Sequence, residues 1–279
     1  MDNIVIAKNA GFCYGVKRAV DEAIKAQKDA NKRIYTLGSL IHNNDAVKYL
    51  EKNNIFSIDE KNIDSLNEDD IIIIRSHGVK ESVIKNLENR NLKIIDLTCP
   101  YVKSIHSKVK DHYEKGYKIM IIGDKTHPEV IGITGWCNDE AIVVNRAEEL
   151  DKIPSKICVV AQTTEKKKTW NSIMEKVVKN SKQIVAFNTI CSATDIRQKS
   201  AFEISMNCDV VIVVGGKNSS NTTKLYEICK ANCENSFHIE NAQELTDNIL
   251  KFKGKKIGIT AGASTPQWIL DEVIKKLKL

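Results

Sequence analysis

Short apolar runs alternate with stretches of helical periodicity along the whole chain. The apolar runs are four to six residues long, the size of β-strands, and the longest are rich in isoleucine and valine. The strand-like segments that contain these runs include residues 3–7, 33–37, 70–76, 92–97, 118–123, 156–161, 183–187, 209–215 and 256–261. Regular alternation of strands with helices predicts an α/β fold.

The strand–helix units recur three times in the same order. In one unit a strand leads into a cysteine and then a helix, and these cysteines are Cys13, Cys99 and Cys191, spaced by 86 and 92 residues. In the other two units a strand ends in a polar tip. These tips are His42, His127 and Ser219 in one unit, and Ser76–His77, Thr163 and Ser264 in the other. Three repeats of about 90 residues therefore describe the chain better than two domains of about 140.

The polar tips fall where strands end and helices begin. Pro100, Pro128 and Pro266 follow tip residues by one or two positions, and proline suits the first turn of a helix. In α/β sheets the carboxyl ends of the strands form the ligand-binding edge, and helix N-termini favour anions. If the three repeats pack around a common axis, their tips converge on one central site.

The composition excludes several classes of protein. With 42% hydrophobic and 28% charged residues, the 279-residue chain is globular rather than disordered. The net charge is +6, but only six of the 42 basic residues are arginine, and aromatic residues make up 6%. Nucleic-acid readers favour arginine and aromatic side chains, so we expect a solvated lysine-rich surface and no nucleic-acid partner. No apolar run could span a bilayer and no signal-peptide pattern is present, which predicts a cytoplasmic protein without membrane association.

The cysteines point to a metal centre. Eight cysteines without an export signal indicate thiols or metal ligands rather than disulfides, and the absence of C-x-x-C excludes a zinc ribbon. Because Cys13, Cys99 and Cys191 hold the same place in their repeats, we predict that they share one metal site. Three thiolates suit a [4Fe–4S] cluster with one open iron, and zinc with three cysteines and an open position is the alternative. A separate metal pair at Cys229 and Cys233 lacks further ligands at metal spacing.

Three histidines are candidate ligand contacts because they lie at tips beside Gly, Asn or Pro; they are His42, His77 and His127. Glu129 follows two residues after His127, at the start of a predicted helix. A carboxylate at that position either complements the helix dipole or, next to a metal centre, serves as a catalytic acid.

A serine-rich loop at residues 215–222 (GGKNSSNT) follows an apolar strand and opens a helix. Its glycines allow close backbone approach, and Ser219, Ser220 and Asn221 can donate hydrogen bonds to phosphate oxygens. The alternative is ordinary helix capping, although two serines and an asparagine in succession exceed what one cap needs.

Nine segments together resemble the 4-hydroxy-3-methylbut-2-enyl diphosphate reductase (LytB) family. They are AGFCYGVKRAV, HNNDAV, RSHGV, DLTCPYV, THPEV, QTT, CSATDIRQ, GGKNSSNT and TAGASTP. The resemblance covers nearly the entire chain, with the segments in order and at compatible spacing.

The resemblance implies three pseudo-repeated α/β domains in a trefoil-like arrangement around one central [4Fe–4S] cluster. The expected domains are residues 14–97, 98–190 and 191–279, the last completed by an N-terminal strand within 1–13. The cluster ligands would be Cys13, Cys99 and Cys191, leaving one iron open.

The implied reaction is the reductive dehydroxylation of an allylic diphosphate to isopentenyl and dimethylallyl diphosphate, the last step of the methylerythritol phosphate route. The substrate-binding residues would be His42, His77, His127, Thr163, Ser219, Ser220, Asn221 and Ser264. Glu129 would handle protons, with Thr163 beside the substrate hydroxyl, and the QTT motif leaves Thr164 as the alternative. No nucleotide motif is visible, so we expect electrons from a ferredoxin or flavodoxin. Two other classes stay open: a cluster-containing sensor without turnover, and a zinc hydrolase acting on a phosphorylated substrate.

Overall fold

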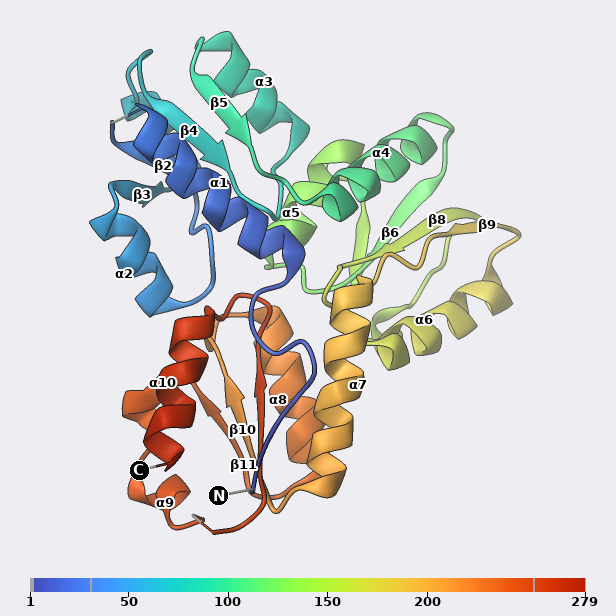
Figure 1. Cartoon of the computed structure of the whole chain (residues 1–279). Coiled ribbons are helices and arrows are strands. Elements are labelled where there is room, and N and C mark those ends of the chain that lie inside the picture. Colours follow the sequence, from blue (N-terminus) through green and yellow to red (C-terminus); the bar gives the residue numbers. More distant parts are fainter. Residues whose placement is uncertain (1–2, 31, 253, 279) are drawn as a thin grey trace. The chain divides into compact units, whose positions relative to one another are not determined.

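Strands and helices alternate from end to end in the computed structural model, which describes residues 3–30, 32–252 and 254–278 (Figure 1). The strands form three sheets of four, and every pairing is parallel. The chain divides into two compact units. We call Arg18–Leu40 with Asn54–Cys191 the two-sheet unit, and Met1–Lys17 with Ile41–Asn53 and Ser192–Leu279 the one-sheet unit.

The first sheet of the two-sheet unit ends with the strand that precedes Cys99. Its strand order is β3 (Ile55–Ile58), β2 (Ile34–Leu37), β4 (Ile71–Ile74) and β5 (Lys93–Asp96). All four residues of β4 are buried, as expected for a central parallel strand covered on both faces, and this burial explains its unbroken isoleucine run. The 3-10 helix η1 (Glu60–Ser65) precedes β4, and helix α3 (Glu81–Asn89) follows it.

The second sheet of this unit separates two hydrophobic cores. Its strand order is β7 (Ile142–Val144), β6 (Lys118–Ile122), β8 (Lys156–Ala161) and β9 (Gln183–Ala186). Its helices are α4 (Pro100–Glu114), α5 (Pro128–Thr134), α6 (Lys167–Asn180) and the 3-10 turns η2 (Gly135–Cys137) and η3 (Ala147–Glu149). Along β6, Ile119 and Ile121 pack against α4 and α5, whereas Met120 and Ile122 pack against α6. This alternation is the two-residue period of a strand.

The one-sheet unit joins the two ends of the chain. Its strand order is β1 (Ile4–Ile6), β12 (Ile257–Ala261), β10 (Val210–Val214) and β11 (Ser236–Ile239), so the N-terminal strand completes the C-terminal sheet. Helix α1 (Tyr14–Ala30) begins in this unit. The other helices are α2 (Asn44–Lys52), α7 (Ser192–Asn207), α8 (Ser220–Asn232), η4 (Ala242–Glu244), α9 (Asp247–Leu250) and α10 (Gln267–Lys278).

The structure confirms the α/β class and all nine predicted strands, and it adds a fourth strand to each sheet. In every sheet one edge is the strand that precedes the cysteine of the repeat (β5, β9 or β1). The other edge is a strand that the sequence did not predict (β3, β7 or β11). The unpredicted strands have only three or four residues and are partly exposed, so their apolar pattern is weak. The predicted domain boundaries stay a prediction.

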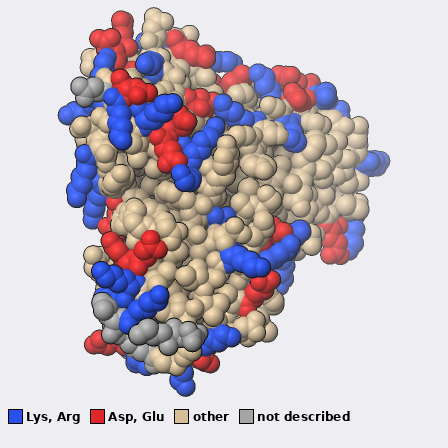
Figure 2. Space-filling model, viewed as in Figure 1, with Lys and Arg blue, Asp and Glu red and all other residues tan. Residues whose placement is uncertain are grey.

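Within the described residues, the longest and most apolar helices still fall short of what a bilayer crossing needs. On the face shown in Figure 2, basic and acidic side chains lie interspersed. This distribution matches the solvated lysine-rich surface expected from the composition.

Candidate active site

The three cysteines of the repeats are anchored in the same way. In each case the cysteine backbone N–H donates to a carbonyl just beyond the end of the neighbouring strand in its own sheet. The bonds join Cys13 to Ala263 (3.1 Å), Cys99 to Ser76 (3.0 Å) and Cys191 to Thr163 (3.0 Å). All three cysteines are partly exposed, and each lies directly before a helix. A helix N-terminus favours a thiolate, so these positions fit metal ligation.

The other cysteines suit structural roles. Burial raises the pKa of Cys158 and Cys229 to about 12 and that of Cys137 to about 11, so these thiols stay protonated at neutral pH. Burial also raises the pKa of Cys208. Cys229 and Cys233 belong to a hydrophobic cluster, which agrees with packing rather than with a separate metal pair.

In the two-sheet unit, Glu129 is bound to Thr163. One carboxylate oxygen accepts the backbone N–H of Thr163 at 2.6 Å, and the other accepts its hydroxyl at 2.7 Å. Glu129 is only 2% exposed. The side chain that caps α5 is that of His127, whose Nδ1 accepts the backbone N–H of Glu129 at 3.1 Å. The Glu129 side chain is therefore not the helix cap, and its carboxylate instead bridges to the loop after β8.

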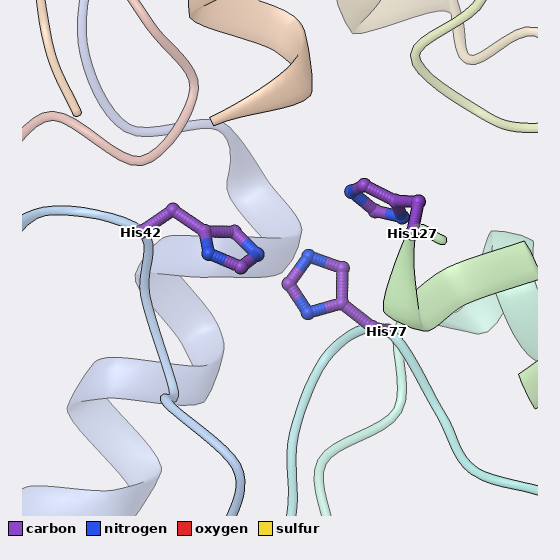
Figure 3. Close-up of side chains that lie close together, drawn as sticks. All are labelled: His42, His77 and His127. Atoms are coloured by element: carbon purple, nitrogen blue, oxygen red, sulfur yellow. The ribbon is translucent and has the colours of Figure 1, made fainter. Parts of the chain in front are cut away.

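His77 and His127 face one another in the same unit (Figure 3). Their ring centroids are 5.4 Å apart, with the rings nearly perpendicular. His77 lies in the turn after β4 and His127 immediately before α5. Ser76, which anchors Cys99, directly precedes His77, and Thr163, which binds Glu129, anchors Cys191. With the contacts of His127 to His77 and Glu129, all six predicted site residues of the two-sheet unit are joined in succession. They are Cys99, His77, His127, Glu129, Thr163 and Cys191.

The structure distinguishes between the two threonines of the QTT motif. Thr163 contacts Glu129, whereas the Thr164 hydroxyl accepts a hydrogen bond from Gln162 Nε2 at 2.9 Å. Gln162 is fully buried, and its Oε1 accepts the backbone N–H of Asp124 at 3.0 Å. Gln162 thus ties together the loops that carry Glu129 and Thr163. In the sequence Gln162 stands out only as part of the QTT motif. Its role as a link could not be predicted, because its bond to Asp124 joins residues 38 positions apart.

In the one-sheet unit, the predicted serines meet at the start of α8. The Ser264 hydroxyl lies 3.3 Å from the Ser219 hydroxyl, and Ser219 caps α8 by accepting the N–H of Thr222 at 3.4 Å. Ser264 directly follows Ala263, the residue that anchors Cys13. The cysteine and the serine loop therefore belong to one continuous region of this unit.

Asn221 lies in the first turn of α8 with its side chain buried and unsatisfied. It is 4% exposed, and neither its Oδ1 nor its Nδ2 has a hydrogen-bond partner among the described residues. An unpaired buried amide is costly and calls for an explanation such as a bound ligand. Together with the neighbouring Ser220 at the N-terminus of α8, it provides polar groups suited to an anion.

His42 is placed by a close backbone contact with this loop. Its carbonyl lies where a Cβ atom on Gly216 would be, so only glycine fits at position 216. The next residue, Asn43, caps α2 by accepting the N–H of Ala46 at 2.9 Å. His42 therefore belongs to the one-sheet unit, as do Cys13, Ser219, Ser220, Asn221 and Ser264.

Comparisons with known proteins show which family the chain resembles along its length. Residues 4–278 match the LytB protein family. A protein from Clostridium perfringens (strain 13 / Type A), named 4-hydroxy-3-methylbut-2-enyl diphosphate reductase, is 64% identical over 277 residues, covering 99% of this chain and 98% of the relative.

Two solved structures are also similar. One is (E)-4-hydroxy-3-methyl-but-2-enyl diphosphate reductase, described as the terminal enzyme of the non-mevalonate pathway, with 40% identity, a TM-score of 0.73, and coverage of 100% of this chain and 99% of that one. The other is the E-1-hydroxy-2-methyl-but-2-enyl-4-diphosphate reductase from Plasmodium falciparum, with 28% identity, a TM-score of 0.90, and coverage of 98% and 86%. The match over nearly the whole length and the shared fold establish that this chain belongs to the LytB family.

Proposed function

We propose that the chain reduces 4-hydroxy-3-methylbut-2-enyl diphosphate to isopentenyl and dimethylallyl diphosphate, the final step of the methylerythritol phosphate route. The family relationship over residues 4–278 supports this activity. The observation that carries it is the shared anchoring of three cysteines beside the predicted polar tips. In the overall reaction the C–O bond breaks, the substrate takes up two electrons and two protons, and water leaves.

The cofactor that fits these residues is an iron–sulfur cluster. Cys13, Cys99 and Cys191 would hold one [4Fe–4S] cluster per chain, and their repeated geometry and partial exposure support that ligand set. Such a cluster supplies single electrons and, at an iron without a cysteine ligand, a Lewis acid for the substrate oxygen. The N–H of Val16 points to the sulfur of Cys13 at 3.5 Å, so this sulfur lies against the first turn of α1.

The diphosphate binds to the polar tips. The buried unpaired amide of Asn221 and the helix N-terminus at Ser220 supply donors in the one-sheet unit. The other proposed contacts are His42, His77, His127, Ser219 and Ser264. Drawing these contacts from several tips would hold the substrate in one orientation and exclude water from the reacting end.

Glu129 supplies the proton that accompanies loss of the hydroxyl group. Its carboxyl group is buried and held by Thr163, so it points in a defined direction. The Thr163 hydroxyl donates to Glu129 and keeps its lone pairs available to accept a hydrogen bond from the substrate hydroxyl. Thr163 thereby positions the leaving oxygen near the acid.

The family relationship also supports proposals for the domains, the electron donor and the location of the protein. The three domains would be residues 14–97, 98–190 and 191–279 with 1–13. Electrons would come from a ferredoxin or flavodoxin, since such acidic donors suit a chain of net charge +6. We place the protein in the cytoplasm, a reducing compartment, in keeping with eight cysteines that form no disulfide within the described residues.

Anaerobic purification provides the test. We expect brown protein with broad visible absorbance, about four irons per chain, and formation of both isoprenoid diphosphates when the chemically reduced protein meets the substrate. A colourless protein with stoichiometric zinc would favour a hydrolase, and a brown protein that never converts substrate would favour a sensor. Either result would overturn the proposed function.

A further inference from the structure

The turn that carries His77 packs against His106 of helix α4 at a position with no room for a side chain. Gly78 has a φ of +69°, and its N–H donates to the Arg75 carbonyl at 3.0 Å, which closes the turn. A Cβ atom at Gly78 would lie 2.5 Å from Cε1 of His106 and 3.1 Å from Cγ2 of Thr98. The backbone conformation and the neighbouring ring therefore both require glycine here.

His106 makes this contact as a neutral, buried ring. It is 5% exposed, and burial lowers its pKa to about 4. Its ring stacks on Trp136, with centroids 4.9 Å apart and planes 18° from parallel. Its Nε2 has no hydrogen-bond partner among the described residues. A ring placed this way contributes through its shape and packing rather than through a polar bond at Nε2.

The residue after Gly78 is held from the same side. Trp136 Nε1 donates to the Val79 carbonyl at 3.1 Å, so the indole that stacks on His106 also binds the turn. A Cβ at Gly132 in α5 would lie 3.4 Å from the backbone of Gly78 and Val79. Residues 78–79 are thus packed against α4, α5 and the η2 turn.

A pocket of about 190 Å³ adjoins this packing and includes Val79, Thr98, His106 and Trp136 among its lining residues. Removing the imidazole would enlarge this space and leave the turn without its support. His77, directly before Gly78, would then lose part of the support that holds it 5.4 Å from the ring of His127.

We infer that His106 is a positioning residue, a wedge that sets His77 against His127 for binding the diphosphate. Trp136 completes the wedge by fixing the Val79 carbonyl. This inference rests on the proposed role of His77 in binding substrate. It adds that a residue packed against the turn of His77, rather than one of the proposed substrate contacts, affects how tightly the diphosphate binds.

The test uses the anaerobically prepared holoenzyme, with inorganic diphosphate as the binding probe and the allylic diphosphate as substrate. We expect His106→Ala to raise the dissociation constant and the KM roughly ten-fold, while kcat changes less than about three-fold. His106→Phe keeps a planar neutral ring against Trp136 and should restore most of the affinity. Weakened affinity with unchanged turnover separates positioning of His77 from general loss of structure.

Coupling to His77 makes the test sharper. If His106 acts through His77, then His106→Ala should add less than about two-fold to the loss already caused by His77→Ala, because the two changes remove the same interaction. Full additivity of the two losses would overturn the inference.

Two further variants distinguish loss of positioning from loss of folding. His112→Ala is the matched control in α4, because the His112 ring packs on Phe187 at 5.2 Å and bonds the Lys108 carbonyl at 2.8 Å; it should leave diphosphate affinity unchanged. If His106→Ala does not fold, Trp136→Phe removes the bond to Val79, leaves a smaller ring against His106, and should raise the dissociation constant about three-fold or more.

Wild-type affinity in both wedge variants, with only a lower thermal midpoint, would overturn the inference and leave the proposed function standing. A fall in kcat at unchanged KM would overturn it as well. If the wild-type protein binds diphosphate but never reduces the substrate, the proposed function fails, while the effect of His106 on diphosphate affinity is still measured.

Discussion

Both carboxylate oxygens of Glu129 accept hydrogen bonds from Thr163, one from its backbone N–H and one from its hydroxyl. The two residues are 34 positions apart and follow neighbouring strands, β6 and β8, of one sheet. Because Glu129 is buried, these bonds operate in a medium of low dielectric constant and define the direction of the carboxyl group. The pair therefore has the rigidity that a proton donor to a fixed substrate needs.

Glu129→Gln should abolish most of the activity. Glutamine can keep both contacts, with its oxygen accepting the Thr163 N–H and its amide donating to the Thr163 hydroxyl, but it cannot deliver an acidic proton. General acid catalysis is worth roughly 10²–10⁴-fold, so single-turnover reduction should slow by that order. Iron content and diphosphate affinity are measured first, and near-normal turnover with both intact would remove Glu129 from the mechanism.

The two adjacent threonines should respond differently to loss of the hydroxyl. Thr163→Val removes a donor to a buried carboxylate, a bond worth about 1.5–3 kcal/mol, and should lower kcat by about ten-fold or more. Thr164→Val removes the acceptor of the Gln162 amide and leaves Glu129 bound to Thr163, so it serves as the matched control, with activity expected within about three-fold of wild type. Equal losses in the two variants would contradict the assignment of Thr163.

Replacing any cysteine of the repeats by serine should deplete the iron. We expect Cys99→Ser protein to lose the broad visible absorbance and the activity, because a hydroxyl is a poor substitute for a thiolate ligand. Cys158→Ser and Cys229→Ser are the controls, since both thiols are buried and their pKa values are raised to about 12. Full iron content in Cys99→Ser would refute the ligand set.

Asn221→Ala should separate binding from stability. The amide is buried with both polar atoms unpaired, so its removal should leave the thermal midpoint of the ligand-free enzyme unchanged or higher. Affinity for inorganic diphosphate should nevertheless fall by roughly ten- to a hundred-fold. Asn232→Ala, at the exposed end of the same helix, provides the control. A destabilised Asn221→Ala protein that binds diphosphate normally would contradict a ligand role.

His106 should make the protein less stable in mild acid. Its pKa falls from 6.5 to about 4 on folding, so between these values the unfolded chain binds a proton that the folded chain does not. Stability is therefore lost as the pH drops from about 6.5 to about 4, by up to about 3 kcal/mol for this group. Thermal midpoints across this range should fall more steeply for wild type than for His106→Phe. Parallel curves would show that His106 does not titrate this way.

Much of the architecture can be predicted from local pattern. The central strands β4, β8 and β10 are unbroken apolar runs because both faces of a parallel sheet are buried, and that pattern survives in the sequence. The polar tips follow from it as well, since a residue directly after such a strand must lie at the ligand-binding edge. The matching positions of Cys13, Cys99 and Cys191 in the three repeats could be recognised in the sequence, because each cysteine lies between a strand and a helix.

The sequence by itself thus determined nine of the twelve strands, the three-fold repeat and the set of polar tips, all of which depend on neighbours close in the chain. Only the tertiary structure decided which of these segments meet. It pairs Ile4 with Ile257, bonds Glu129 to Thr163 rather than Thr164, and places His106 against Gly78. These contacts join residues far apart in sequence, and their partners are selected by the packing of whole sheets and helices rather than by any local preference.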